Sequence, residues 1–220
     1  MSLRAIESGE SMNARAITRA AAALAGMSLA VLGLAGPARA GQWVGVDPAH
    51  DVAAFDCKPA CHWQNTPRNT SADMVRQVVT YRHDTIRITV TLRKVDTGAA
   101  FALTSILKRN EKIGRYFAVI AQFSPGRTST VVVRNPHGVP VECGAATPQL
   151  VGNKIKVVIP SRCVHSPDWL RWSGYTRVIF AGDLDDDAKF EGYFDKFRTG
   201  SETPLNKHTF EFSRRVYRAA

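Results

Sequence analysis

The densest group of carboxylates in this sequence is Asp183, Asp185, Asp186 and Asp187. Alternating aspartates suit Ca²⁺, which takes six to eight oxygen ligands, so Asp183, Asp185 and Asp187 are candidate metal ligands. The alternative is a short helix whose free backbone N–H groups bind the same carboxylates in its first turn. Ala188 stands where an EF-hand loop needs glycine, and alanine favours the helix. We therefore expect no cofactor and no strong dependence on Ca²⁺, with a structural Ca²⁺ as the alternative.

A second pair of carboxylates, Asp47 and Asp51, could act as general acid and base in a hydrolase. His50 lies between them and is expected at the surface. The other histidines are scattered, and the chain has no G-x-S-x-G or H-E-x-x-H motif. The sequence therefore indicates no catalytic residues. A secreted hydrolase that uses loop carboxylates or histidines remains an alternative.

Three aromatic residues, Trp63, Trp169 and Tyr193, are candidate ligand-binding residues, because sugar rings stack on aromatic faces. Trp63 is the best of them, since it lies in a stretch that its own disulfide would pin. Trp169 and Trp172 are three residues apart on a predicted strand, so their side chains point to opposite faces. We therefore expect Trp172 in the core and Trp169 exposed beside Arg171.

The four cysteines allow three pairings. We expect Cys143 to pair with Cys163, because the two bracket a hairpin, and Cys57 to pair with Cys61 across a small loop. The first bridge closes a loop of about twenty residues, which stabilises the fold by roughly 3 kcal/mol in the chain-entropy model. A metal site at Cys57, Cys61 and His62 is the alternative, but it lacks a second pair of ligands.

The first forty residues have the pattern of a signal peptide. Arginines precede an apolar run over residues 20–34, and Ala38 and Ala40 form a small-x-small cleavage site. The apolar run is shorter than the roughly 20 residues that span a bilayer. We therefore expect residues 1–40 to be removed and residues 41–220 to form a single secreted, extracellular domain in which disulfides persist.

The chain is basic, with 29 lysines and arginines against 19 aspartates and glutamates and a formal net charge of +10. Four of the arginines and two of the glutamates precede residue 41, which leaves +8 on the rest. Such a charge attracts anionic surfaces. The basic residues are spread along the chain, so no specific nucleic-acid footprint is indicated. The expected partner is an extracellular glycan or an anionic cell-surface polymer, with no transmembrane span and no oligomeric state indicated.

The secondary-structure elements that position these residues are predicted to be strands. Residues 85–93 alternate strictly, so Ile86, Ile88, Val90 and Leu92 are expected to face a core. Further strands are expected over residues 74–81, 100–107, 115–123, 128–134, 154–159, 169–180 and 208–217. Short strands at this spacing predict an all-β fold, an antiparallel β-sandwich of immunoglobulin-like or jelly-roll type with one or two short helices.

Two stretches interrupt the strands and are expected to be long loops, residues 57–71 and residues 183–203. Binding sites often lie on such loops. The second is expected to hold one helical turn near residues 186–190, with Phe190 and Phe194 on one helix face, packed on the sheet.

Four short segments follow a pattern found together in other chains. Residues 47–52 read D-P-A-H-D-V, 71–74 read S-A-D-M, 163–172 read C-V-H-S-P-D-W-L-R-W and 186–188 read D-D-A. They resemble segments of a group of secreted actinobacterial β-sandwich proteins. The outline is also similar to DOMON-like domains and family-nine carbohydrate-binding modules. That resemblance implies a sandwich with a sugar or haem ligand, with Met74 and the histidines available to haem.

The function predicted from the sequence is thus a secreted, disulfide-stapled binding module for a glycan or cell-wall polymer. The alternatives are the hydrolase described above and a structural interaction module without a small ligand.

Overall fold

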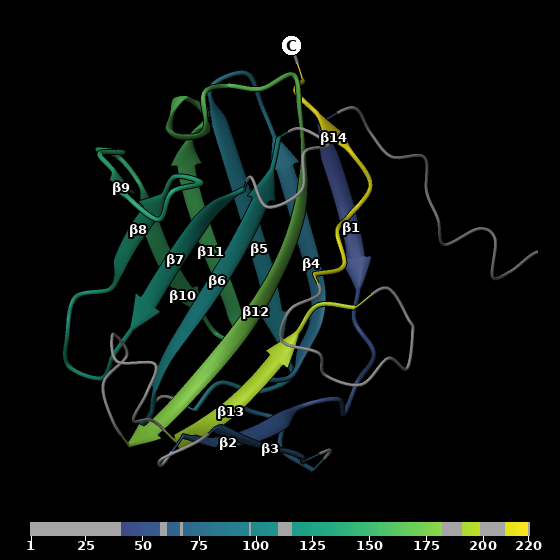
Figure 1. The fold of residues 1–220 in the computed structure, drawn as a ribbon, viewed down its shortest axis with the longest axis vertical. Helices are drawn as coiled ribbons and strands as arrows, with labels where there is room; N and C mark the ends of the chain where they lie inside the picture. Colours follow the sequence, from purple (N-terminus) through teal and green to yellow (C-terminus); the bar gives the residue numbers. More distant parts are fainter. Residues whose placement is uncertain are drawn as a thin grey trace, which may run out of the picture. The chain divides into compact units, whose positions relative to one another are not determined.

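The computed structural model describes seven stretches of the chain, all within one compact unit, Arg39–Ala220 (Figure 1). These stretches are residues 41–57, 61–66, 68–96, 98–109, 116–181, 191–198 and 210–219. The expected signal peptide, residues 1–40, and the expected helical turn at residues 186–190 lie outside them. In the described part, no helix is long and apolar enough to cross a membrane.

The fold is all-β and consists of two antiparallel sheets (Figure 1). The first sheet has five strands in the order β1-β4-β5-β11-β10. Their bounds are Gln42–Val46 for β1, Met74–Tyr81 for β4, Thr85–Leu92 for β5, Lys154–Pro160 for β11 and Thr147–Val151 for β10.

The second sheet has nine strands, with eight in the order β3-β2-β13-β12-β6-β7-β8-β9 and β14 paired to β12. The strands at one side are Cys61–Asn65 for β3, Ala53–Cys57 for β2, Glu191–Lys196 for β13 and Trp169–Ala181 for β12. The others are Ala100–Lys108 for β6, Phe117–Phe123 for β7, Thr130–Arg134 for β8, Pro140–Val141 for β9 and Val216–Tyr217 for β14.

The core lies between the two sheets, because one hydrophobic cluster contains side chains of both. The prediction for β5 is confirmed, since Ile86, Ile88, Val90 and Leu92 are all buried. Trp172 of β12 is also buried, as its parity predicted. Its ring packs against Trp43 of β1, with centroids 5.8 Å apart. The predicted antiparallel sandwich is therefore the fold of the chain.

Several local predictions were wrong. Residues 61–65 form β3 and residues 191–196 form β13, although both stretches were read as loops. Phe194 therefore lies on a strand, where it packs with Phe55 and Ile179 instead of along a helix face. Of the strand expected over residues 208–217, the described part begins at Phe210, and within it only β14 forms. Among the described residues, the helical part is the 3-10 helix η1, Ser161–Val164.

The C-terminal segment forms backbone hydrogen bonds to both sheets. The Ser213 N–H donates to the Trp172 carbonyl (2.7 Å), and the Trp172 N–H donates to Ser213 Oγ (2.9 Å). Further on, the Ala219 N–H donates to the carbonyl of Tyr81 in β4 (3.0 Å). The segment thus continues from β12 of one sheet to the end of β4 in the other.

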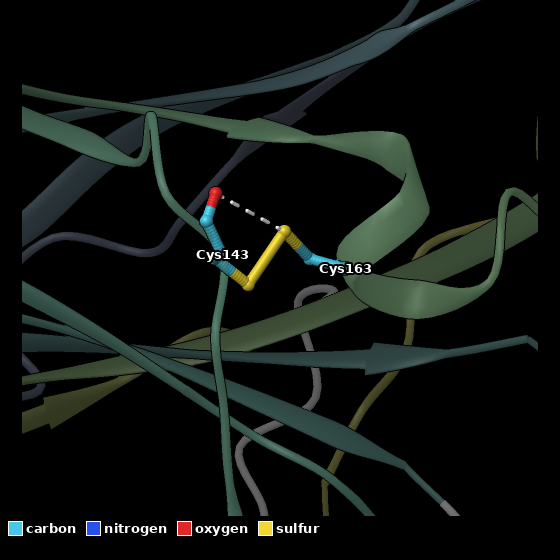
Figure 2. Close-up of a disulfide and its surroundings, with 2 residues drawn as sticks. All are labelled: Cys143 and Cys163. Atoms are coloured by element: carbon cyan, nitrogen blue, oxygen red, sulfur yellow. Dashed lines mark hydrogen bonds between the residues drawn. A yellow bond between two sulfur atoms is a disulfide. The ribbon is translucent and has the colours of Figure 1, made fainter.

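The predicted Cys143–Cys163 disulfide is confirmed (Figure 2). It links the loop before β10 to the 3-10 helix η1, with the two Cα atoms 5.5 Å apart. Both cysteines are buried and belong to the central core. The side chains of Cys57 and Cys61 lie outside the described part, although their backbones face each other in the β2–β3 hairpin. That second bridge therefore stays a prediction.

Candidate metal centre

Three carboxylates from distant parts of the chain meet at one place in the fold. Asp47 follows β1, Asp51 lies in the loop to β2, and Asp195 lies in β13. Each offers one oxygen, and the three oxygens lie within 4.8 Å of one another. Two oxygens bound to one Ca²⁺ can lie at most about 5 Å apart, twice the Ca–O distance. The spacing therefore permits all three to bind the same ion.

The alternation of β13 directs Asp195 inward. Its neighbour Phe194 packs in a separate small cluster with Phe55 and Ile179. The register partner of Asp195 is Thr176 of β12, which is buried and donates its hydroxyl to the Ala72 carbonyl (2.6 Å). Asp195 is therefore enclosed between the sheets and has a relative exposure of 0%.

The loop that carries Asp47 and Asp51 is held by a fourth carboxylate, Asp73. The His50 N–H donates to Asp73 Oδ2 (3.2 Å), and the same oxygen accepts a bond from Arg93 Nε (2.8 Å). His50 has a φ of +70°, a left-handed conformation that is uncommon for residues other than glycine. His50 is exposed, as expected, and its backbone belongs to a turn between Asp47 and Asp51.

The carboxylates are buried and only partly hydrogen-bonded. The Arg198 N–H donates to Asp47 Oδ1 (2.7 Å), and the Met74 N–H donates to Asp195 Oδ2 (2.6 Å). Within the described part of the chain, the second oxygens of Asp47 and Asp195 and both oxygens of Asp51 have no hydrogen-bond partner. Buried polar atoms in native proteins are normally bonded, so these oxygens are positions where an ion or a water could bind.

The charges of the cluster point to a divalent cation. The four aspartates would carry four negative charges. Two guanidinium groups offset them in part: Arg93 bonds Asp73, and Arg198 Nε lies 3.6 Å from Asp51 Oδ2. Two negative charges then remain among these six described residues, which is the charge that one Ca²⁺ neutralises.

Without an ion, the cluster favours protons. Burial raises the pKa of Asp47 from 3.8 to about 10, and the charges of Asp195 and Asp51 add to the rise against the Arg198 backbone bond. Burial and then the Asp51 charge raise the pKa of Asp195 well above its usual value. Burial also raises the pKa of Asp51, against the nearby Arg198 guanidinium. Protons and a cation therefore compete for the same oxygens.

The geometry suits a structural ion better than catalysis. The structure does bring the predicted pair Asp47 and Asp51 together. However, Asp47 and Asp195 are buried, and the most accessible carboxylate, Asp51, has a side-chain exposure of only 15%. A hydrolytic acid–base pair must reach the bond of its substrate. Ser105 and Lys108 match S-x-x-K, but they lie on β6 with a spacing of three and point to opposite faces.

The other predicted site residues are not gathered here. Asp183, Asp185 and Asp187 lie outside the described residues, as does the side chain of Trp63 in β3. Trp169 was expected to be exposed, but it is half-buried on β12, where the Arg215 guanidinium carbon lies 4.4 Å from its ring centroid. Tyr193 packs against the central core from β13. Trp169 and Tyr193 therefore belong to opposite faces of the nine-stranded sheet.

Sequence reasoning missed Asp73 and Asp195 as site residues. Asp73 stands directly before an alternating strand, and Asp195 lies between Tyr193 and Phe197, which both pack on the core. A carboxylate at an inward position of an alternating pattern is the signal that could have identified Asp195. No family model, curated protein or solved structure matches this chain.

Proposed function

We propose that this protein is an extracellular β-sandwich binding module for a glycan or cell-wall polymer, and that one Ca²⁺ ion completes its fold. The ion would be held by Asp47, Asp51 and Asp195. The observation that carries the cation site is the convergence of these buried carboxylates, with unpartnered oxygens within 4.8 Å of one another. Hard oxygen ligands of this kind suit Ca²⁺.

The ion would act as a structural link. Asp47 and Asp51 belong to the loop after β1, while Asp195 belongs to β13 of the other sheet. The Met74 N–H, at the start of β4, bonds the same Asp195 carboxylate (2.6 Å). An ion at this point would tie the two sheets together and would hold the loop to β2 in place. It would bind the carboxylate oxygens that have no hydrogen-bond partner in the described part of the chain.

The extracellular setting is supported by the Cys143–Cys163 disulfide, because such bonds persist in oxidising compartments. Extracellular modules also bind Ca²⁺ weakly, with dissociation constants of about 10⁻⁴ to 10⁻³ M. The glycan ligand is supported by the fold, by the resemblance to carbohydrate-binding modules and by the positive charge of the chain. The burial of Asp47 and Asp195 argues against the hydrolase.

The cation site is tested by thermal unfolding of the protein in EDTA and in about 5 mM CaCl₂, several times a typical extracellular dissociation constant. A Kd of 10⁻⁴ M would give roughly 2 kcal/mol of stabilisation at this concentration, a rise in melting temperature of several degrees. Asp51→Asn should reduce the rise, because it removes a ligand that is only partly buried. Asp84→Asn, in the exposed β4–β5 turn, is the matched control and should leave it intact. Equal melting temperatures in EDTA and CaCl₂ would contradict the cation site.

The ligand class is tested by a pull-down against a panel of soluble and insoluble polysaccharides. Retention on at least one of them supports the glycan proposal. Absence of retention across the panel, with the protein folded, would contradict it and leave the cation site to its own test.

A further inference from the structure

The outer face of the five-stranded sheet is a regular surface built from outward-facing side chains of five paired strands. Side chains alternate along each strand, and the inward ones, such as Val79, Ile88 and Val157, are buried. The outward ones form three rows across the five strands, because the strand registers align. One row runs from Val46 through Arg76, Thr91 and Lys154 to Val151.

The composition of these three rows is unusual. They contain valine, threonine, glutamine and the four cations Arg76, Arg87, Lys154 and Lys156. None of the described residues in the rows is a carboxylate, so no acid at a facing position offsets the four charges. Valines at the edges are well exposed, with Val46 at 71%. The face is thus positively charged and exposed to solvent.

The four cations are spaced apart. Arg76 and Lys154 lie in one row with Thr91 between them, so their backbones are about 10 Å apart, two strand spacings. Lys154 and Lys156 are separated by about 7 Å along β11. Arg87 lies diagonally from Lys156, at about 7–8 Å. Charges at such intervals fit a ligand with repeated anionic groups better than a single phosphate.

The opposite outer face of the molecule uses its cations differently. On the nine-stranded sheet, Lys196 lies over the ring of Phe210 (4.8 Å to the centroid), and Lys108 lies over the ring of Phe212 (5.8 Å). The segment that carries these rings packs on that sheet through Ser213. The cations of the five-stranded sheet have aliphatic and hydroxyl neighbours instead.

We propose that the outer face of the five-stranded sheet, centred on Arg76, Arg87, Lys154 and Lys156, binds a linear anionic polysaccharide. This inference rests on the proposed function and names its ligand class and surface. The threonine hydroxyls and the glutamine amides between the cations match sugar hydroxyls as donors and acceptors. The cations pair with carboxylates on successive sugars.

Two other polyanions fit the face less well. Nucleic-acid strands are held by aromatic side chains on which bases stack, and none of the described residues of this face is aromatic. Peripheral membrane binding uses large apolar side chains such as Trp, Phe and Leu, whereas the apolar residues here are valines. The polyanion that fits the face is therefore a polyhydroxylated chain with repeated anionic groups and without aromatic bases.

The test measures binding of the full chain to polygalacturonate by affinity electrophoresis or calorimetry, with neutral dextran as the reference. We expect binding to polygalacturonate at low salt and its progressive loss as NaCl rises, because salt screens exposed charges. Lys154→Gln/Lys156→Gln should weaken binding by about tenfold. Arg127→Gln/Arg162→Gln removes two exposed cations that lie off the face and should change it by less than about twofold.

Three results would overturn the inference. The first is an equal loss of affinity in the two double variants, which would mean that only net charge matters. The second is tighter binding to anionic phospholipid vesicles or to single-stranded DNA than to polygalacturonate at the same salt. The third is binding to a neutral glycan alone, which would leave the proposed function standing and remove this surface from it. Circular dichroism confirms that each variant is folded.

Discussion

Raising the pH should destabilise the metal-free protein through its buried carboxylates. The pKa of Asp47 is raised from 3.8 to about 10 in the folded state, chiefly by burial. Below pH 4 the group is protonated in both the folded and the unfolded state. Between pH 4 and pH 10 the folded state keeps a proton that the unfolded state has lost. The free energy of unfolding therefore falls as the pH rises through this window.

The size of the effect follows from proton linkage. Each proton that the folded state binds in excess costs about 1.4 kcal/mol of stability per pH unit. From pH 5 to pH 8, one such proton on Asp47 gives at most about 4 kcal/mol. A domain of this kind is stable by about 5–15 kcal/mol, so the change is a large share of the total. The pKa of Asp195 is raised in the same direction and steepens the slope.

The assay is urea unfolding at pH 5, 6.5 and 8, in EDTA and in CaCl₂. Ca²⁺ should stabilise the protein more at pH 8 than at pH 5, because at pH 5 it must displace protons. Asp47→Asn mimics the protonated carboxyl, and it is the control. In EDTA it should lose part of the pH slope, and it should respond less to CaCl₂.

An equal pH slope for the wild-type protein and Asp47→Asn in EDTA would contradict proton binding by Asp47. Equal stabilisation of the wild-type protein by CaCl₂ at pH 5 and pH 8 would contradict competition between protons and the ion.

Three further substitutions test the scaffold around the site. Cys143→Ser/Cys163→Ser should lower the free energy of unfolding by about 3 kcal/mol, the loop-closure value for twenty residues, as measured by urea unfolding with and without reductant. Gly192→Ala would put a Cβ against the carbonyl oxygen of Val178, so it should displace β13 and reduce the response to CaCl₂. An undiminished response would contradict this placement of β13. Ser213→Ala removes the acceptor of the buried backbone N–H of Trp172. It should lower the free energy of unfolding by about 1–3 kcal/mol and speed hydrogen exchange at that amide. Unchanged exchange would show that the C-terminal segment does not protect this part of β12.

The sandwich was predictable because its strands alternate locally. In β5, four inward apolar residues alternate with threonine and arginine, and one wet face and one dry face follow directly. β13 offers no such pattern. Gly192 and Asp195 made it resemble a loop, and only its pairing with β12 and β2 explains why it is extended. Tertiary pairing thus overrode a weak local preference.

Part of the site could be predicted from the sequence and part could not, because only some of its residues are close together in the chain. Asp47 and Asp51 are four residues apart, and their pairing is visible in the sequence. Asp195 joins them from about 145 positions away, through sheet packing that no local pattern records. The carboxylate-rich segment at Asp183–Asp187 drew attention because it is dense. The structural cluster instead combines sparse carboxylates from the loop after β1 and from β13.

The most direct test of the cation site is a crystal structure of the protein grown in CaCl₂, with anomalous diffraction to locate the ion. We expect one anomalous peak between Asp47, Asp51 and Asp195, about 2.3–2.6 Å from a carboxylate oxygen of each. A well-ordered cluster without a peak, or a Ca²⁺ bound at Asp183, Asp185 and Asp187 instead, would contradict the account.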